Sequence, residues 1–317
     1  MFFRNILLFF LFFFTIDFSF AWGFWGHKQI NKMAVFTLPP ELFPLYKKNI
    51  DYITEQAVTP DKRRYTNKIE APRHYIDLDH YGLEPFSVLP KSWKNAVTKY
   101  TEDTLNAYGI VPWHIQVMLH SLTEAFRKKD LNEILYYSAN IGHYIADAHV
   151  PLHTTENYNG QLTNQHGIHG FWESRIPELI GEKFDYIVGQ AEFIDNPLDK
   201  AWQIVKESHA EVDSVLDLEL ILNDSIPSDR KYSFEQKGNQ MLKVYSQEYS
   251  LAYNRLLNGM VERRMRQAIS AVGAFWYTAW VNAGQPDLRK LYSKKAASKE
   301  GEEEVDYERN QIKGHSD

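Results

Sequence analysis

Apolar residues from Trp22 onward recur mostly three and four positions apart, the spacing of amphipathic helices, and strand-type alternation is scarce. Prolines divide residues 41–111 into expected short helices and loops, and residues 154–168 form an expected polar loop rich in Asn and Gly. No internal repeat is visible. We therefore expect an all-α fold with a single helical domain over residues 22–290. The predicted longer helices cover residues 26–38, 113–128, 131–148, 197–222, 233–257 and 261–283, and a further helix begins near Ile168.

The first 21 residues have the layout of a secretory signal peptide. Arg4 precedes an apolar run at residues 6–14, and small residues lead to an expected cut after Ala21. The alternative is an uncleaved membrane anchor, which needs about 20 apolar residues. Because Asp17 interrupts the run, we expect cleavage and an exported protein, periplasmic or secreted, without a transmembrane anchor.

At the other end, residues 291–317 are charged and have few large apolar groups, so a disordered tail is expected. The whole chain carries 35 Lys and Arg against 41 Asp and Glu, a net charge of -6. Such a chain has no overall attraction for nucleic acid or anionic lipid, so a phosphate-bearing substrate must be held locally. Cysteine is absent, which excludes disulfides, thiolate zinc sites and a cysteine nucleophile.

The densest cluster of candidate metal ligands lies near the middle of the chain. His143 and Asp147 are four residues apart in a predicted helix, so both side chains project from one face. His153 follows the end of that helix, and His169 and Glu173 repeat the four-residue spacing. Imidazole and carboxylate are ligands that zinc accepts. A single pair of this kind is common on a polar surface helix, but two pairs and an intervening histidine favour a metal site.

Three more candidate ligands lie upstream: His27, which is five residues after Trp22, Asp61 and His74. The complete set resembles the superfamily of zinc-dependent phospholipases C and single-strand-specific zinc nucleases. The resemblance implies long helices around a trinuclear zinc cluster, in which the α-amino nitrogen and carbonyl oxygen of an N-terminal Trp bind one zinc. The nine ligand positions of the superfamily are matched by Trp22, His27, Asp61, His74, His143, Asp147, His153, His169 and Glu173.

The resemblance also implies how three zinc ions are shared among these residues. The first would be held by Asp61, His74, His143 and Asp147, the second by His153, His169 and Glu173, and the third by Trp22 and His27, with Asp147 bridging. Zinc ions a few ångströms apart lower the pKa of a shared water, supply hydroxide and stabilise charge developing on a phosphate. We therefore expect an exported zinc-dependent hydrolase of phosphodiester bonds.

Several features resemble the nuclease branch of the superfamily. The spacing from Trp22 to the next ligand is short, and Arg64 matches a position where nucleases contact phosphate. With Asp61, a bridging or base-like carboxylate, Arg64 is an expected catalytic residue. Tyr75 and Asp77 resemble nuclease residues that stack on a base and hydrogen-bond its edge, so they are the expected substrate-binding residues.

These assignments have simpler alternatives. Tyr75 could serve only in core packing, and Arg64 could be a solvated charge like its neighbours Lys62 and Arg63. The remaining histidines match no ligand position, and we expect them to support the site from outside, to pack or to lie on the surface. They include His80, His114, His120, His149, His166 and His209.

Other features resemble the phospholipase C branch. The last ligand is Glu173 rather than the Asp of the nucleases, the gap between His153 and His169 is short, and cysteines are absent. Because the second ligand segment is the most distinctive, the sequence favours a phospholipase C-like substrate, with single-stranded nucleic acid as the alternative. A non-catalytic exported zinc-binding protein is a further alternative, against which the carboxylate of Asp61 argues. Nothing in the sequence implies a stable protein partner.

The role of Trp22 can be tested directly. An N-terminal Met or tag would convert its α-amino group, whose usual pKa is about 7.7–8.0, into an amide nitrogen with no useful lone pair. We expect the tagged protein to lose or weaken one zinc and to lose most activity, and a protease cut that exposes Trp22 to restore both. Zinc analysis before and after the cut measures this. A tagged protein with three zinc ions and full activity would contradict the ligand role.

Overall fold

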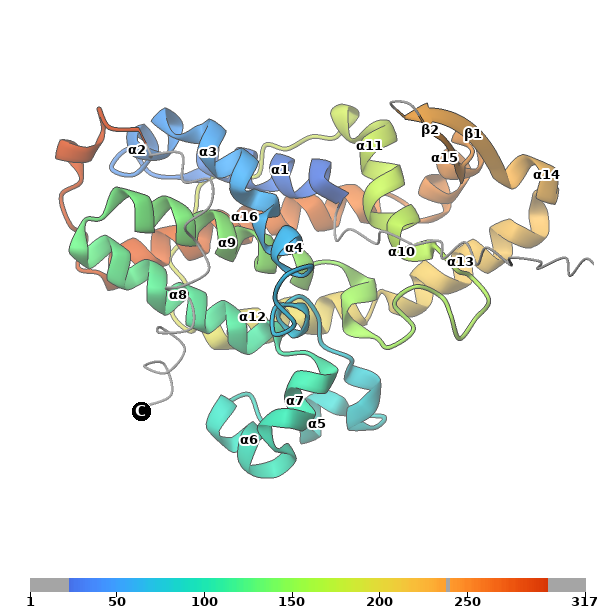
Figure 1. Cartoon of the computed structure of the whole chain (residues 1–317), viewed down its shortest axis with the longest axis horizontal. Helices are drawn as coiled ribbons and strands as arrows, with labels where there is room; N and C mark the ends of the chain where they lie inside the picture. Colours follow the sequence, from blue (N-terminus) through green and yellow to red (C-terminus); the bar gives the residue numbers. More distant parts are fainter. Residues whose placement is uncertain (1–22, 238–239, 296–317) are drawn as a thin grey trace, which may run out of the picture.

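The computed structural model describes residues 23–237 and 240–295 (Figure 1). Trp22, the predicted signal peptide and residues 296–317 of the predicted tail lie outside the described residues, so the domain boundaries stay predictions. The hydrophobic core of the described part is one continuous cluster that reaches from Ile30 to Leu291. In that part, no helix combines the length and apolar character needed to cross a membrane.

Helices account for most of the described chain, which confirms the predicted all-α class. In the first half they are α1 (Gly23–Ala34), α2 (Phe43–Lys48), α3 (Ile50–Glu55), α4 (Thr59–Arg63), α5 (Pro85–Val88), α6 (Trp93–Tyr100), α7 (Glu102–Tyr108), α8 (Val111–Lys128) and α9 (Leu131–Ala148). In the second half they are α10 (Ile168–Gly170), α11 (Ile176–Ile180), α12 (Pro197–His209), α13 (Val212–Ser225), α14 (Ser228–Lys231), α15 (Gln247–Leu256) and α16 (Met260–Asn282).

Shorter helical turns join these helices. One of them, η6 (Phe171–Arg175), is π-helical, a form that is rare and frequent at functional sites. The 3-10 turns are η1 (Val35–Thr37), η2 (Gln56–Val58), η3 (Ala71–Arg73), η4 (Leu78–Tyr81), η5 (Pro151–Thr154), η7 (Gly181–Lys183) and η8 (Arg289–Leu291).

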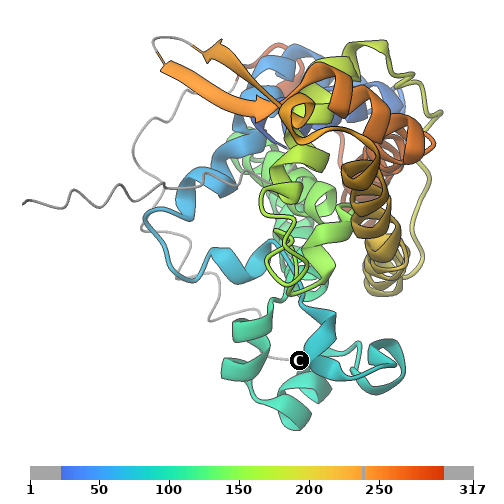
Figure 2. The ribbon, with the colours of Figure 1, turned by 90° about the vertical axis from the view of Figure 1, so that its right-hand side faces the viewer.

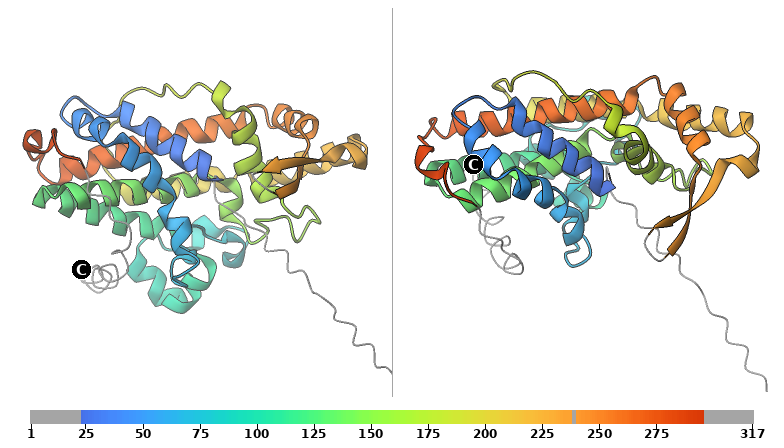
Figure 3. Two further views of the ribbon diagram at one scale, coloured as in Figure 1. Left: turned by 45° about the horizontal axis from the view of Figure 1, so that its top comes forward. Right: turned by 90° about the horizontal axis from the view of Figure 1, so that it is seen from above.

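Helix α9 is the centre of the bundle. It contacts α8, α1, α16 and α12, and the long helices lie side by side in the views of Figures 1 and 3. Every residue from Ser138 to Ala148 is buried, as expected for a helix enclosed on all sides. Helix α8 ends where Lys129 adopts a left-handed conformation, and the Asp130 side chain caps α9 by accepting from the Glu133 N–H at 3.0 Å. These signals explain why α9 matches its predicted bounds.

A glycine lets α1 approach α9 closely. A Cβ atom added to Gly142 would lie 2.1 Å from Asn31 Oδ1, so a larger residue would displace the Asn31 side chain from this contact. Asn31 also donates from Nδ2 to the carbonyl oxygen of Ala139 at 3.0 Å. His27 lies one turn before Asn31, and His143 follows Gly142. The contact therefore brings these two imidazoles together.

Arg264 of α16 fixes the end of α9. Its guanidinium is buried and donates to the carbonyl oxygen of His149 at 2.9 Å, to that of Ile204 at 3.4 Å and to Ser208 Oγ. Burial lowers the pKa of Arg264 to about 10, so it stays charged at neutral pH. A cation among the unpaired carbonyls at helix C-termini is favourable. It holds the segment that leads to His153.

Helices α5, α6 and α7 form a small group at one side of the bundle (Figure 2). The chain returns from α7 alongside the segment after η3, where Ile110 N–H donates to Pro72 O and Asp77 N–H to Tyr108 O, both at 2.7 Å. Gly109 permits this contact, because a Cβ atom there would lie 2.2 Å from the carbonyl oxygen of Tyr75. The small group therefore supports the strip that carries Tyr75 and Asp77.

The predicted helix over residues 233–257 is wrong in its first half. Strands β1 (Tyr232–Lys237) and β2 (Gln240–Tyr245) form an antiparallel hairpin that projects from one end of the bundle, and α15 begins only after the capping residue Ser246 (Figures 1 and 2). Apolar and polar side chains alternate over the first four residues of β1, Tyr232 to Glu235, a period that favours a strand over a helix. The predicted helix over residues 197–222 is divided into α12 and α13.

Replacing Arg264 with Ala tests whether its hydrogen bonds fix the end of α9. We expect a loss of about 3 kcal/mol in the free energy of unfolding, because buried carbonyl groups lose their donors. Its neighbour Arg263 is exposed and pairs with Glu211 at 3.4 Å, so Arg263→Ala is the matched control, with an expected loss below about 1 kcal/mol. Denaturant unfolding measures the free energy of unfolding of both variants. Equal losses would contradict the stabilising role of the Arg264 hydrogen bonds.

Candidate metal centre

The predicted i, i+4 pair of α9 points into the protein. His143 and Asp147 are both fully buried, and His143 Nε2 lies 3.1 Å from Asp147 Oδ2. The other imidazole nitrogen, Nδ1, lies 2.8 Å from the carbonyl oxygen of Ala57. Because a carbonyl can only accept, this contact leaves Nε2 as the lone-pair nitrogen, which is the form that binds a metal.

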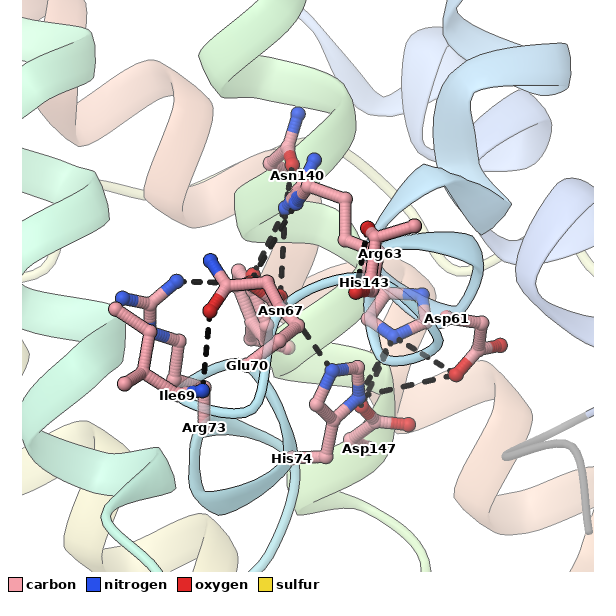
Figure 4. A network of polar contacts seen from close by, with 12 residues as sticks. Asp61, Arg63, Asn67, Ile69, Glu70, Arg73, His74, Asn140, His143 and Asp147 are labelled. Atoms are coloured by element: carbon pink, nitrogen blue, oxygen red, sulfur yellow. Dashed lines mark hydrogen bonds and ion pairs between the residues drawn. The ribbon is translucent and has the colours of Figure 1, made fainter. Parts of the chain in front are cut away.

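Asp61 and His74 reach the same place from outside the bundle. Figure 4 shows their side chains converging on His143 and Asp147. His74 Nδ1 lies 2.9 Å from Asp147 Oδ2 and 3.0 Å from His143 Nε2. Asp61 Oδ1 lies 3.7 Å from His143 Nε2 and 3.8 Å from His74 Nδ1. The four residues that the sequence assigned to the first zinc are therefore neighbours.

His27 of α1 adjoins this group. Its Nε2 lies 3.3 Å from Asp147 Oδ1, and its ring stacks on His143 with centroids 3.9 Å apart. Both oxygens of Asp147 thus face imidazoles, as a bridging carboxylate would. Trp22, the other residue expected at the third zinc, lies outside the described residues, directly before α1.

The remaining candidates form a second cluster. Glu173 Oε2 lies 3.4 Å from His153 Nε2 and 3.1 Å from His169 Nε2. His153 belongs to η5, His169 to α10 and Glu173 to the π-helical turn η6, and all three are buried. His153 Nδ1 is 3.8 Å from Asp147 Oδ1, so the two clusters adjoin.

These residues fit a metal ion by geometry and by chemistry. Their ligand atoms form three groups, each with all atoms within 4.8 Å of one another: His27, Asp61 and His143; His74, His143 and Asp147; and His153, His169 and Glu173. Both oxygens of Asp61 and both of Glu173 are buried without a hydrogen-bond partner. Leaving carboxylates unpaired in the interior is costly, and a cation bound there would satisfy them. Imidazole and carboxylate together suit zinc.

The electrostatics of the site keep the acids ionised. Burial by itself raises the pKa of Asp147, but the charges of His143 and His153 outweigh it and hold that pKa well below its usual value. Burial also opposes ionisation of Glu173, and neighbouring imidazoles lower its pKa below the usual value. Burial and the charge of His143 lower the pKa of His27, which favours neutral imidazole. Burial opposes charging of His143 and His153 as well, but Asp147 and its neighbours raise their pKa values, that of His153 to about 9. Zinc binds neutral imidazole, so a bound ion would replace the protons of these two side chains.

The predicted substrate-binding residues lie on the strip beside His74. Burial, followed by the charges of Asp79 and Glu156, raises the pKa of Asp77 to about 7, so its carboxyl is partly protonated near neutral pH. Burial and the charge of Asp77 raise the pKa of Tyr75, while the charge of Arg64 acts to lower it. Arg64 is exposed at the end of α4. Tyr75 is therefore close enough to Asp77 and Arg64 for their charges to influence it.

The other histidines lie outside the three groups. His149 is buried with Nδ1 2.7 Å from the carbonyl oxygen of Ile145, and burial holds its pKa well below the usual value. His166 is exposed. His114 is buried against the Tyr144 ring at 4.5 Å between centroids.

Sequence reasoning missed a buried network behind His74. Arg63, interpreted as a solvated base, donates from Nη2 to Asn140 Oδ1 at 2.6 Å and lies 3.4 Å from Glu70 Oε1. Arg73 Nη1 donates to Glu70 Oε2 at 2.7 Å, and the Tyr144 hydroxyl also donates to Glu70. Burial opposes ionisation of Glu70, but His74 and the two arginines lower its pKa well below the usual value. The four-residue spacing from Glu70 to His74 was the available signal.

An all-helical bundle with buried groups of imidazoles and carboxylates fits the class of zinc-dependent hydrolases. The sequence model of the S1/P1 nuclease family matches residues 22–269, more than half of the chain. The chain belongs to the S1/P1 nuclease family, whose members are zinc-dependent enzymes that hydrolyse phosphodiester bonds. No curated protein matches the chain.

The family match corrects one expectation. The sequence favoured a phospholipase C-like substrate because of Glu173 and the short gap before His169, but the match extends over most of the chain and supports the nuclease alternative better. The match agrees with the resemblance of Arg64 and of the segment from Tyr75 to Asp77 to nuclease residues.

Removing His143 is expected to lower the zinc content by at least one ion per chain and to abolish hydrolysis. His149→Ala is the matched control, because His149 is equally buried and also has Nδ1 against a backbone carbonyl but faces no carboxylate. Elemental analysis and phosphodiester hydrolysis measure both variants. A His149→Ala protein that loses zinc or activity while staying folded would contradict the assignment.

Proposed function

We propose that this protein is an exported nuclease that cleaves single-stranded nucleic acid at a centre of three zinc ions. The observation that carries the proposal is that the eight predicted ligands within the described residues lie in two adjoining buried clusters, in a chain of the S1/P1 nuclease family. Export rests on the signal-peptide layout of residues 1–21.

The proposed ligand sets are those that the resemblance implies, and the contacts of Asp147 support its shared role. Each of the three ions would have at least one carboxylate and one imidazole, with Asp147 shared between the first and third because its two oxygens face different imidazoles. The first ion would be held by Asp61, His74, His143 and Asp147, the second by His153, His169 and Glu173, and the third by Trp22 and His27. When bound, the ions would supply Lewis acidity and lower the pKa of water.

The protein's own groups have distinct tasks in the proposal. Asp61 has two buried oxygens without hydrogen-bond partners, so one can bind a metal while the other accepts a proton. Arg64 is exposed near Tyr75 and would hold a phosphate of the substrate. Its local positive charge compensates for the net charge of -6, which does not attract a polyanion.

A nucleobase of the substrate would be held by the segment from Tyr75 to Asp77, directly after His74. The ring of Tyr75 offers a stacking surface, which accepts any base and is worth about 1–3 kcal/mol per base. A carboxyl with a pKa of about 7, as at Asp77, is present in both protonation states near neutral pH, so it can donate to or accept from a base edge. A base must be unpaired and unstacked to reach such a strip, which favours single strands.

A substrate panel tests the proposal. We expect the zinc-loaded mature protein to hydrolyse single-stranded DNA and RNA at least about tenfold faster than duplex DNA, because pairing hides the base edges that Asp77 would contact. Phosphatidylcholine vesicles should be hydrolysed poorly, and a chelator should abolish all hydrolysis. Faster cleavage of the vesicles than of single strands would restore the phospholipase reading, and no hydrolysis of any substrate by the zinc-loaded protein would refute the proposal.

The phosphate contact has a matched control in the same panel. Arg64→Ala should lower kcat/KM for single-stranded DNA by about 10–100-fold, the expected effect of one charge-assisted hydrogen bond. Lys62 is an exposed base two residues away, and Lys62→Ala should change kcat/KM less than about threefold. If both variants lowered kcat/KM equally, general charge attraction would explain the loss, and a specific contact between Arg64 and phosphate would be contradicted.

A further inference from the structure

Glu70 occupies an unusual place beside the metal centre. It is completely buried and belongs to none of the three ligand groups. Its Oε1 lies 3.5 Å from Nε2 of His74, at the outer limit of a hydrogen bond, and the two residues are four positions apart. The opposite nitrogen of the same ring, Nδ1, faces Asp147 at 2.9 Å. His74 is therefore placed between the centre and a buried carboxylate.

The ring of His74 can present Nδ1 as a lone pair only if Nε2 carries the proton. In His143 and His153, Nδ1 lies 2.8 and 2.7 Å from a backbone carbonyl oxygen, so a proton on Nδ1 leaves Nε2 as the lone-pair nitrogen. His74 Nε2 is buried and makes no hydrogen bond within the described residues, and the carboxylate oxygen Oε1 of Glu70 lies 3.5 Å from it. A carboxylate behind a metal-bound imidazole fixes its tautomer and increases the basicity of the ligand nitrogen.

Glu70 is itself held rigidly. Arg73 donates to Oε2 at 2.7 Å, and Arg63 lies 3.4 Å from Oε1 (Figure 4). The Tyr144 hydroxyl donates to Oε1 as well. Arg63 also donates to Asn140 at 2.6 Å. Tyr144 and Asn140 belong to α9, the helix that carries His143 and Asp147. The network thus joins the segment that carries His74 to the helix that carries the other ligands.

We propose that Glu70 is a positioning residue, which accepts a hydrogen bond from Nε2–H of His74 and so holds Nδ1 toward the metal. This inference rests on the proposed metal centre, and it adds a residue that the ligand motif does not contain. Glu70 touches neither substrate nor metal in this role. Its effect is on zinc affinity and on the tautomer of His74, not on the binding of nucleic acid.

Glu70→Gln in the full-length mature protein is the first test. It keeps the size of the side chain but removes the charge, and we expect the affinity for one zinc ion to fall by about 10–100-fold. Competition with a chromogenic chelator measures the affinity, and Glu70→Asp, which keeps the charge, should recover part of the loss. An unchanged zinc affinity in folded Glu70→Gln protein would overturn the proposal.

Glu219 provides the matched control. It is also a buried carboxylate, held by Lys231 at 2.8 Å, Tyr249 at 2.7 Å and Gln165 at 2.6 Å, with no predicted ligand among these partners. Glu219→Gln removes a buried charge from a comparable network, so it should lower the free energy of unfolding but leave the affinity for the first zinc unchanged. Equal losses of that affinity in both variants would show a general structural effect and overturn the positioning role.

If Glu70→Gln does not fold, the tautomer of His74 in the wild-type protein tests the proposal instead. In zinc-loaded protein labelled with 15N-histidine, His74 should have its proton on Nε2 and its metal-bound nitrogen at Nδ1, and His74→Gln identifies the signals by their loss. A metal-bound Nε2 would overturn the proposal. Because neither readout uses nucleic acid, a protein without nuclease activity but with these zinc and tautomer results would refute the proposed function and retain the role of Glu70.

Discussion

The architecture depends on placing carboxylates in the interior without a lysine or arginine beside them. The recorded partners of Asp61, Asp147 and Glu173 in the described residues are imidazoles, and several of the carboxylate oxygens have no hydrogen-bond partner. Charges buried in this way destabilise a fold unless a cation joins them. Three regions of the chain, α1, the segment from α4 to η3, and α9 with the turns after it, are therefore arranged around positions that suit metal ions.

Sequence reasoning could find the paired ligands because their local geometry is simple, whereas Trp22, His27, Asp61 and His74 were assigned through the resemblance to a family. His143 and Asp147 lie one helical turn apart, and a capped, uninterrupted α9 leaves little freedom in how they point. The network behind His74 was not accessible in the same way. Arg63 and Asn140 are 77 positions apart, and only the fold shows that this arginine faces inward rather than into water. Pairwise contacts over such separations leave no periodic signal in a single sequence.

The contrast between local and long-range contacts also explains which predictions about the fold were right and which were wrong. The helical class and the bounds of α9 follow from apolar spacing and capping residues, which act locally. The hairpin of β1 and β2 was missed because six-residue strands are too short to outweigh the helical pattern of α15 that follows. The family match supports the nuclease alternative better than the phospholipase reading for a related reason: Glu173 and the loop before it are local features, whereas family membership is distributed over residues 22–269.

The packing of α1 against α16 has a consequence for the order in which the protein can assemble. The first helix of the described chain has one of its main neighbours in the last long helix (Figure 3), so that contact can form only after nearly all of the chain has been synthesised. Contacts of such high sequence separation slow folding, because the loop between them must close first. Helix α1, which carries His27, therefore completes its packing only when the C-terminal helix docks and closes the bundle.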